Sequence, residues 1–299
     1  MLKVNNIVKY YGPIKAVDGL SFDEKKVEIF GLLGVNGSGK STTFRMIMGL
    51  LDLNDGSISL NGRKVDYDIT DTIGFLTEER SLLTKLTVKE QAIYYGILKG
   101  MTEDLIMKRL DYWLDRFDVK EYKERKIKEL SKGNQQKIQF IMAIINEPSL
   151  LILDEPFSGL DPINVELFKD VIKEFKNKGT MIIFSSHRME HVELFCEKLV
   201  IMVKGKSVLE GYLKDIKRNY RKKNIFVSGD IDIAAIKKIK GVVACTKRNE
   251  DYEVKIEDET KVNNVFKYVS TCNNVTKFIV EEPSLNEIFV EKVGESYDN

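Results

Sequence analysis

The stretch KVEIFGLLGVNGSGKST, residues 26–42, joins a short apolar segment to a glycine-rich turn. Its second half, GVNGSGKST (34–42), fits the spacing G-x-x-x-x-G-K-[ST], in which backbone N–H groups curl around phosphate groups. The apolar segment predicts a strand before the turn, and TTFRMIMGLL (42–51) predicts a helix after it, which is the context that such a loop requires. We therefore expect a phosphate-binding loop, and a plain glycine-rich turn is the alternative.

Each residue type in this loop has a physical task. Glycines leave room for the N–H groups to turn inward, and the following helix presents the positive end of its dipole. A lysine at this position reaches the β- and γ-phosphates, and the hydroxyl group after it ligates Mg²⁺. Ser41 is therefore also a predicted metal ligand. The predicted nucleotide-binding residues of the loop are Gly34, Asn36, Gly37, Ser38, Gly39, Lys40, Ser41 and Thr42.

A second apolar strand, SLLILDEP (149–156), ends in two acidic residues. Next to a phosphate loop, Asp154 is placed to hold Mg²⁺, directly or through water. Glu155, one residue further, can accept a proton from an attacking water. We therefore predict that Lys40 and Glu155 are catalytic and that Asp154 is a metal ligand. The alternative is that the two acids only cap a following helix.

A third strand, TMIIFSSH (180–187), also ends in polar residues. Strands that alternate with helices form a mainly parallel sheet in an α/β fold, and ligands bind outside the carboxyl ends of its strands. His187 at that edge is predicted to be catalytic, through a hydrogen bond to a γ-phosphate oxygen or to the attacking water. A structural role is its alternative. His191, one helical turn further on, is expected at the surface.

The apolar periodicity also divides the chain. Residues 1–215 carry the strands and motifs of the α/β domain, and helical spacing over about 80–146 predicts a helical subdomain within it. Ser131 is the expected N-cap of one of these helices. The basic, apolar-poor run at 214–223 predicts a boundary, with a linker over 216–223.

Beyond the linker, residues 224–299 follow the order β-α-β-β-α-β and then a terminal helix from Ser284. This order predicts a small α+β domain of the ferredoxin-like kind.

The composition excludes several classes of protein. The 299 residues carry a net charge of +1, so no global positive field would recruit nucleic acid or an anionic membrane surface. The 3 cysteines lie far apart and form no Cys/His cluster, which predicts reduced thiols in a cytosolic protein. Apolar runs such as LVIMV (199–203) are far shorter than the ~20 residues that cross a bilayer.

Five sequence elements, taken in order, resemble one family. They are GVNGSGKST, LSKGNQQK (130–137), LLILDEP, SGLDP (158–162) and SSH. Over residues 1–215 the chain resembles the nucleotide-binding subunit of an ABC transporter, and the second element separates this family from other phosphate-loop ATPases. The resemblance implies a P-loop NTPase core, ATP and Mg²⁺ as cofactors, and ATP hydrolysis as the activity.

The resemblance also implies that two subunits share each ATP. Ser131 and Gly133 would contact the γ-phosphate of an ATP held by the opposite subunit, and Asp161 would line that interface. Tyr11 matches the aromatic residue that stacks on adenine, a contact with a ring face that discriminates weakly between bases. The first implied partner is therefore a second ABC ATPase subunit, in a homodimer or a heterodimer.

Two elements depart from the family pattern. The usual LSGGQ is LSKGN here, so Lys132 replaces a glycine and Asn134 replaces the glutamine. The stretch IGFLTEERSLLTKLTV (73–88) falls where the family has its glutamine loop, and Glu78 stands at the glutamine position. An ionised glutamate can ligate Mg²⁺ but cannot donate a hydrogen bond as an amide does. Glu78 is therefore included among the predicted metal ligands.

These departures, with the acidic tail EEPSLNEIFVEK (281–292), resemble the ATPases of ABC-2-type exporters, including those for sodium efflux and drug or peptide resistance. That branch implies a separate integral membrane permease as the second partner. It places the ATPase in the cytoplasm, at the inner face of the cell membrane. The near-neutral net charge and the acidic tail argue against a nucleic-acid partner.

Two other functions stay open from the sequence. One is a soluble ABC ATPase that acts on nucleic acid or ribosomes, and the other is a regulatory subunit that binds ATP without hydrolysing it. The C-terminal domain carries no catalytic constellation. We expect it either to stabilise the dimer or contact the permease, or to sense a small ligand.

Overall fold

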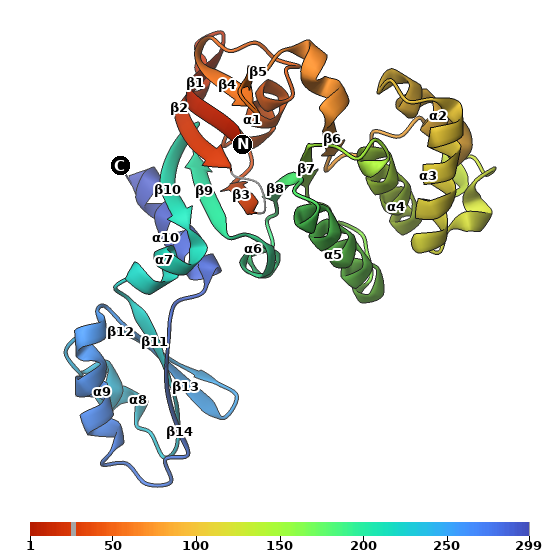
Figure 1. The fold of residues 1–299 in the computed structure, drawn as a ribbon. Helices are drawn as coiled ribbons and strands as arrows, with labels where there is room; N and C mark the ends of the chain where they lie inside the picture. Colours follow the sequence, from red (N-terminus) through yellow and green to blue (C-terminus); the bar gives the residue numbers. More distant parts are fainter. Residues whose placement is uncertain (25–27, 299) are drawn as a thin grey trace. The chain divides into compact units, whose positions relative to one another are not determined.

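The computed structural model describes residues 1–24 and 28–298. The chain forms two compact units, Met1–Glu210 and Gly211–Asn299 (Figure 1). The first unit holds the phosphate loop and the other four elements of the family resemblance, and the second unit corresponds to the predicted C-terminal domain.

The basic run at the boundary is folded. Of the expected linker 216–223, the first part belongs to helix α7 (Leu213–Asn219) and Lys223 begins strand β11 (Lys223–Ser228). The side chain of Lys223 is buried, and its Nζ donates to the carbonyl oxygen of Arg218 at 3.3 Å. The chain also divides after Glu210 rather than at the expected position 215. Basic composition alone misled because the stems of long cationic side chains can pack against apolar neighbours.

The central sheet of the first unit has six strands in the order β10-β9-β3-β8-β7-β6. Neighbouring strands are parallel in the pairs β3-β8, β3-β9, β7-β8 and β6-β7, as predicted. Residues 26 and 27 of the predicted first strand lie outside the described residues. The strands span Ile29–Gly34 (β3), Ile73–Leu76 (β6), Leu150–Asp154 (β7), Met181–Ser185 (β8), Lys198–Val203 (β9) and Lys206–Tyr212 (β10).

Three adjacent strands of this sheet position the site. β3, β8 and β7 run side by side in the same direction, so their carboxyl ends meet at one edge. Asp154 on β7 pairs in register with Ser185 on β8. The near-continuous burial of β7 and β8 is what a sheet covered on both faces requires.

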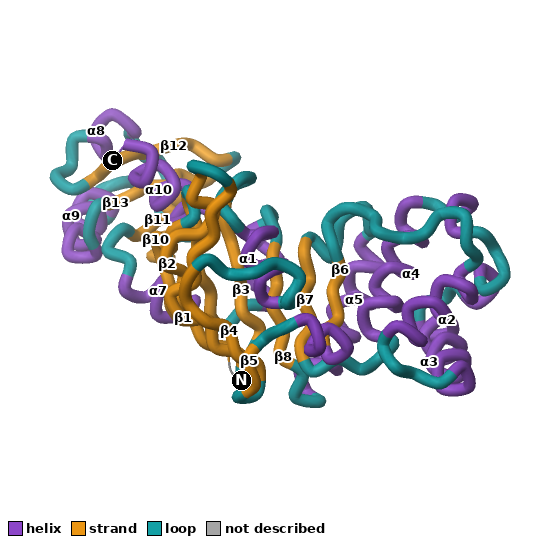
Figure 2. Tube along the Cα trace, turned by 90° about the horizontal axis from the view of Figure 1, so that it is seen from above, coloured by secondary structure: helices purple, strands orange, loops and turns teal. Residues whose placement is uncertain are grey.

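Helices flank the sheet and also form the predicted helical subdomain, which Figure 2 shows beside the strands. Ser131 caps α4 as predicted, because its hydroxyl oxygen accepts from the N–H of Asn134 at 3.2 Å. The rings of Phe140 and Phe168 stack at 4.4 Å and join α4 to α5. The helices of the first unit are α1 (Lys40–Ile47), α2 (Val88–Leu98), α3 (Glu103–Arg116), α4 (Lys132–Ile144), α5 (Pro162–Asn177) and α6 (Met189–Phe195).

A second, antiparallel sheet in the first unit is absent from the sequence prediction. Its order is β2-β1-β4-β5, and its strands span Leu2–Tyr11 (β1), Ile14–Glu24 (β2), Asp55–Leu60 (β4) and Arg63–Lys64 (β5). The pairing of β1 with β2 shifts register between Val4 and Ile7, and Asn6 there has a φ of 45°. Such irregularities break the two-residue alternation by which a strand is read from sequence.

The second unit has the predicted order β-α-β-β-α-β. Its sheet order is β12-β13-β11-β14, and the pairs β11-β13, β11-β14 and β12-β13 are antiparallel. This is the ferredoxin-like arrangement. Besides α7 and β11, its elements are α8 (Ile233–Lys237), β12 (Val242–Arg248), β13 (Asp251–Ile256), α9 (Val262–Val269), β14 (Lys277–Glu281) and α10 (Leu285–Asp298).

The start of α10 lies where the sequence predicted the terminal helix. Ser284 and Glu287 form a reciprocal cap, because Ser284 N–H donates to Glu287 Oε2 at 3.0 Å and Glu287 N–H donates to Ser284 Oγ at 3.3 Å. The core of this unit is a cluster that includes Ile225, Val254 and Val265.

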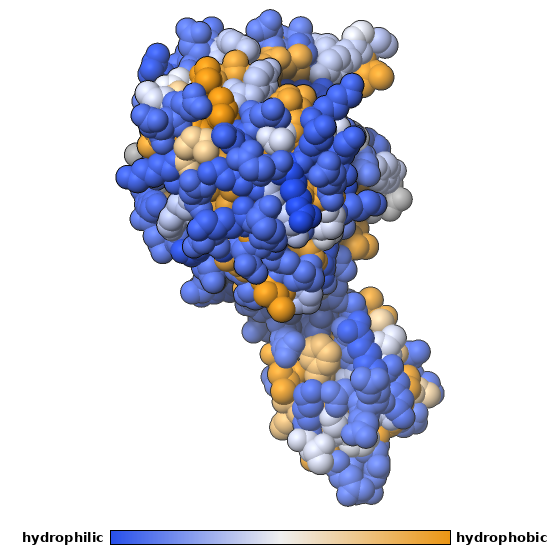
Figure 3. Space-filling model, turned by 90° about the vertical axis from the view of Figure 1, so that its right-hand side faces the viewer, coloured by the Kyte–Doolittle hydropathy of each residue, from blue (hydrophilic) through white to orange (hydrophobic). Residues whose placement is uncertain are grey.

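Among the described residues, no helix combines the length and the apolar character needed to cross a membrane. Figure 3 shows a mostly hydrophilic surface on the face in view, with apolar side chains in small separate groups.

Candidate active site

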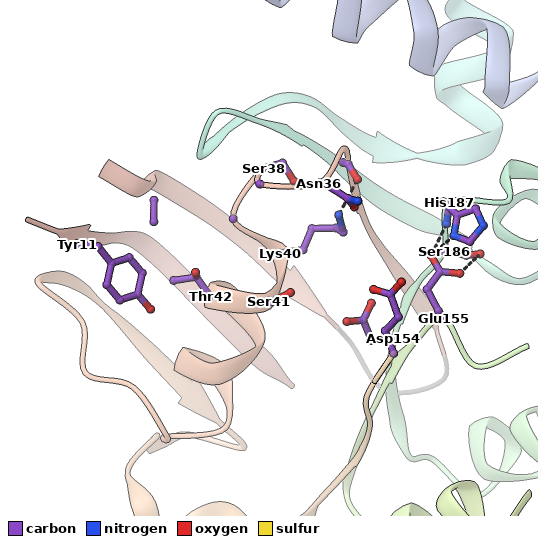
Figure 4. Close-up of a pocket in the computed structure, with 15 residues that line it drawn as sticks. Tyr11, Asn36, Ser38, Lys40, Ser41, Thr42, Asp154, Glu155, Ser186 and His187 are labelled. Atoms are coloured by element: carbon purple, nitrogen blue, oxygen red, sulfur yellow. Dashed lines mark hydrogen bonds and ion pairs between the residues drawn. The ribbon is translucent and has the colours of Figure 1, made fainter. Parts of the chain in front are cut away.

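A cavity of about 730 Å³ lies at the carboxyl edge of the central sheet (Figure 4). It brings together the phosphate loop, the two acids at the end of β7 (Asp154 in the strand and Glu155 after it), the residues that follow β8, and Glu78. Its walls are Tyr11, Ala16, Gly34, Asn36, Gly37, Ser38, Gly39, Lys40, Ser41, Thr42, Glu78, Asp154, Glu155, Ser186 and His187. Residues far apart in sequence thus meet where the parallel register predicted.

Two glycines of the phosphate loop cannot carry a side chain. Gly34 and Gly39 have φ values of 155° and 104°, in a region that favours glycine. A Cβ atom at Gly34 would lie 2.4 Å from the carbonyl oxygen of Met202, and one at Gly39 would lie 2.4 Å from that of Ala16. The close approach of the backbone to β9 and β2 therefore fixes the loop that opens α1.

The Lys40 ammonium reaches back over this loop. Its Nζ donates to the carbonyl oxygens of Gly34 at 2.6 Å and Val35 at 3.2 Å. Burial lowers the pKa of Lys40, and the negative charges of Asp154 and Glu155 oppose that shift. A partly desolvated cation between carbonyl groups and carboxylates is suited to receive an anion.

Asp154 is a buried carboxyl group whose charge the nearby Lys40 ammonium offsets only in part. It is 8% exposed, and burial raises its pKa to about 6. The nearby Ser185 hydroxyl and the charge of Lys40 oppose the rise, and the charges of Glu78 and Glu155 add to it. A bound cation would remove this cost.

The cavity fits Mg²⁺ through oxygen ligands. The Ser41 hydroxyl and the carboxylates of Asp154 and Glu78 all line it, and Mg²⁺ prefers such oxygens together with phosphate oxygens and waters. In the part of the chain that the structure describes, no group of three or more His, Cys, Asp or Glu side chains could hold a metal by itself. The metal would therefore depend on ligands from the nucleotide and from water.

Glu155 is held in one orientation from two sides. The Ser186 hydroxyl donates to Oε2 at 3.0 Å, and the backbone N–H of His187 donates to Oε1 (Figure 4). Glu155 itself has a φ of 50°, a left-handed conformation that is unfavourable for a side chain of this kind. Strained backbone of this sort clusters at functional sites.

His187 contacts the same carboxylate through its ring. Nδ1 lies 2.9 Å from Oε1 of Glu155, and the side chain is otherwise exposed. A carboxylate only accepts hydrogen bonds, so Nδ1 carries the proton in this contact. The neutral ring then has an unprotonated Nε2, which cannot donate to a phosphate. To donate there, the ring must be cationic or must turn away from Glu155.

His191 corrects the expectation of a surface residue. Its side chain is 9% exposed and packs edge-on against the ring of Phe157 at 4.8 Å. Burial lowers its pKa, which favours the neutral ring. Only one face of the short helix α6 is buried, and His191 belongs to it because Val192 and Phe195 also pack inward.

Three predicted nucleotide contacts lie outside this cavity. Ser131 and Asp161 cap α4 and α5, and Gly133 follows in the first turn of α4. The Cβ position at Gly133 lies 3.5 Å from the carbonyl oxygen of Gly159, so the start of α4 is adjacent to the SGLD segment. The Ser131 oxygen accepts a hydrogen bond within the helix, which leaves its proton available to a ligand.

Two residues that line the cavity were missed from sequence. Ser186 lies inside the SSH element, and its position between a strand end and His187 could have indicated a contact with the neighbouring strand. Ala16 carries no such signal, because it contributes through backbone position on β2. Tyr11, the predicted adenine contact, does line the cavity and is exposed.

A phosphate loop with its lysine, together with two acids at the carboxyl end of another parallel strand of the same sheet, defines a P-loop ATPase. Within that class, the family model described as ABC transporter matches residues 17–158. The model described as the C-terminal domain of DrrA1-3-like ATP-binding proteins matches residues 211–293. The chain belongs to the family of ABC transporter ATP-binding proteins.

Relatives and solved structures agree with this assignment. The chain is 49% identical to the uncharacterized ABC transporter ATP-binding protein YhaQ of Bacillus subtilis, over 100% of each chain. It is 31% identical to the linearmycin resistance ATP-binding protein LnrL of the same species, over 98% of each. A solved ATP-binding subunit of an ABC transporter is similar with a TM-score of 0.69 and 31% identity, over 74% of this chain and 93% of that one. A dimeric ATP-binding cassette bound to ADP and Pi is similar with a TM-score of 0.65 and 26% identity, over 71% and 99%.

Proposed function

We propose that this chain is the ATP-hydrolysing subunit of an ABC-2-type exporter and that it energises a separate membrane permease by ATP-dependent dimerisation. The observation that carries the proposal is the cavity in which the phosphate loop and Lys40 face Asp154 and Glu155. The exporter branch is supported by the similarity to LnrL, whose name refers to linearmycin resistance, and by the match of the second unit to a DrrA1-3-like domain.

The residues around the nucleotide divide the chemical work. Lys40 and the N–H groups of the loop bind the phosphates, and Tyr11 stacks on the base. Glu155 orients the attacking water and accepts its proton, while Ser186 holds the carboxylate in place. His187 helps to hold the Glu155 carboxylate through the contact between its Nδ1 and Oε1 of Glu155.

Mg²⁺ is the proposed cation at this cavity. Ser41, Asp154 and Glu78 would hold it, together with phosphate oxygens and water. When bound, Mg²⁺ neutralises charge on the β- and γ-phosphates. The buried carboxyl group of Asp154, whose pKa burial raises to about 6, supports its position.

The elements LSKGNQQK (130–137) and SGLDP (158–162) support a site shared between two subunits. Ser131, Gly133 and Asp161 lie outside the cavity of their own chain, at the adjacent starts of α4 and α5. We infer that they contact the nucleotide of a second subunit. A nucleotide bridged in this way holds two subunits together until its γ-phosphate is removed.

A second cavity of about 410 Å³ supports a permease contact in the first unit. It lies beside the loop that carries Glu78, because Thr77 and Ser81 line it. A movement at the nucleotide site would therefore reach this cavity through the loop. Most of its wall is apolar, and exposed Leu50, Tyr67 and Leu98 lie at it. An exposed apolar surface of this kind is typical of a protein contact. Through such a contact the subunit would lie at the inner face of the membrane.

The Glu155→Gln variant tests the function. It keeps the shape of the side chain but cannot accept the proton, so the ATP turnover of the wild type should fall by about 10²–10⁴-fold with nucleotide affinity retained. The variant should then accumulate an ATP-bound dimer in size-exclusion chromatography and should co-purify with a stoichiometric integral membrane protein. Normal turnover in the variant would mean that a residue other than Glu155 accepts the proton. A wild-type protein that binds ATP without Mg²⁺-dependent phosphate release would be a regulatory subunit. An ATPase stimulated by RNA or ribosomes rather than by the membrane protein in vesicles would favour the nucleic-acid function.

A further inference from the structure

Gln139 on α4 reaches out of its helix to hold the segment next to Glu78. The side chain is 3% exposed, and its Nε2 lies 3.0 Å from the carbonyl oxygen of Thr77, 2.9 Å from Thr77 Oγ1 and 3.2 Å from the carbonyl oxygen of Glu79. Carbonyl oxygens only accept hydrogen bonds, so the nitrogen and not the oxygen of the amide must face them. The orientation of the amide group is therefore fixed by its partners.

The segment it holds has little other support. Outside the undescribed residues 25–27 and 299, no hydrogen bond between main-chain groups involves residues 78–82. Side chains hold the segment instead. The Thr77 hydroxyl donates to the carbonyl oxygen of Glu79, and at its far end Leu83 N–H donates to Gln91 Oε1 at 2.8 Å. A segment of this kind opens at low free energy unless such contacts close it.

Glu78 lies between the two residues that Gln139 grips. Its side chain lines the nucleotide cavity, and its charge acts on both Lys40 and Asp154. Gln139 itself lines the second, apolar cavity on the other side of the segment. Gln139 thus lines the second cavity, proposed for the permease, and holds both neighbours of Glu78, which lines the nucleotide cavity.

We propose that Gln139 is a positioning residue that sets the place of the Glu78 carboxylate at the metal. It does not touch the nucleotide; it acts by fixing the backbone on both sides of Glu78. This inference rests on the proposed function, because it takes Glu78 as a Mg²⁺ ligand. Partners that orient metal ligands in this way strongly affect metal affinity when they are removed.

The Gln139→Met variant removes the donor and keeps the length of the side chain. Gln139 Oε1 is buried with no hydrogen-bond partner within the described residues, so methionine also removes an unsatisfied acceptor and should leave the fold intact. Lys137→Met is the matched control. It removes a buried donor two residues earlier on the same helix, where Nζ donates to the carbonyl oxygen of Phe117 at 3.0 Å.

Two measurements on the full chain separate positioning from simple stability. In Gln139→Met, hydrogen exchange of the Leu83 amide, which donates to Gln91 at the end of the segment, should be at least about tenfold faster without nucleotide than in Lys137→Met. The Mg²⁺ concentration that half-saturates ATP binding should rise about tenfold, while ATP affinity without Mg²⁺ stays within about twofold. Thr77→Val, which removes an acceptor of the same amide without touching α4, should shift both measurements in the same direction.

Unchanged exchange in Gln139→Met would overturn the proposal, and so would fast exchange with an unchanged Mg²⁺ requirement. Neither result depends on turnover. A wild-type protein without Mg²⁺-dependent ATPase activity would instead refute the proposed function, and the exchange experiment would still report on the grip of Gln139.

Discussion

In the nucleotide cavity of the first unit, burial shifts the pKa of Lys40 downward and that of Asp154 upward, so both groups are pushed toward their neutral forms. In the second unit the shifted carboxyl groups go the other way. The ion pair with Lys277 lowers the pKa of Asp251, and for Glu287 hydrogen bonds from Lys255, Ser284 and Asn224 outweigh burial and bring the pKa to about 2.

The difference separates a site from a scaffold. The second unit already supplies partners for its charges, as in the bond from Asn224 Nδ2 to Glu287 Oε2 at 2.8 Å. In the nucleotide cavity, by contrast, the charges of Lys40 and Asp154 are only partly compensated by protein groups, and a bound ligand would supply the rest. A pKa that is shifted by burial within a cavity is a better indication of function than a pKa that is shifted by an ion pair. Removing a charged group from the nucleotide cavity should therefore leave the free energy of unfolding unchanged or raise it. Removing one from the second unit should lower it.

The largest effect is expected at Lys40. Lys40→Met should weaken ATP binding by about 100-fold or more, because it removes a desolvated charge from an anion site. The free energy of unfolding without nucleotide should stay within about 1 kcal/mol of the wild type or rise, since a partly buried ammonium is costly. Titration with a fluorescent ATP analogue and thermal denaturation measure the two quantities. Lys108→Met, at an exposed lysine, should change neither.

In the second unit the sign should reverse. Glu287→Gln should lower the free energy of unfolding of that unit by about 1.5–3 kcal/mol at neutral pH, because it removes a charged acceptor. The folded pKa of about 2 lies below the ordinary value of 4.5, so this stabilisation is complete above pH 4.5 and is lost as the pH falls toward 2. Hydrogen exchange of α10 at pH 7 and pH 3 measures it, with exposed Glu282→Gln as control. Equal loss at both pH values would contradict the ion-pair account.

The smallest effect concerns Asp154. Its folded pKa of about 6 lies above the ordinary 3.8, so the nucleotide-free protein should lose stability as the pH rises from 3.8 to about 6 and then stay level. Asp154→Asn should remove this dependence and be more stable by about 1–2 kcal/mol at pH 7.5. Mg²⁺ with ATP should reverse the order by stabilising only the wild type. Urea denaturation from pH 4 to 8 measures it, and a variant less stable than the wild type at pH 7.5 would mean that Asp154 is already neutralised. Exposed Asp170→Asn should show no such pH-dependent difference.

Local sequence patterns predicted the parts of the first unit that obey one simple rule. Continuous apolar strands that end in polar residues predicted the parallel sheet and the edge at which Asp154 and Ser185 meet. The antiparallel sheet was not predicted, because the backbone at Asn6 leaves the regular extended form. The ferredoxin-like unit was predicted because its elements are short, regular and in an unmistakable order.

Contacts between side chains could not be read in the same way. The grip of Gln139 on Thr77 spans 62 residues of sequence and depends on the path of a loop. His191 was misplaced because one turn of helix does not show which of its faces is covered. To predict the contact between Ser186 and Glu155, one would have to know that β8 lies next to β7.

The left-handed backbone at Glu155 has a consequence for anyone who wishes to make this cassette more heat-resistant. A glycine there would accept the same backbone without strain and should raise the melting temperature, yet it would remove the carboxylate that we propose as the catalytic base. A screen for thermal tolerance alone would select for that exchange, so it should be paired with a screen for phosphate release.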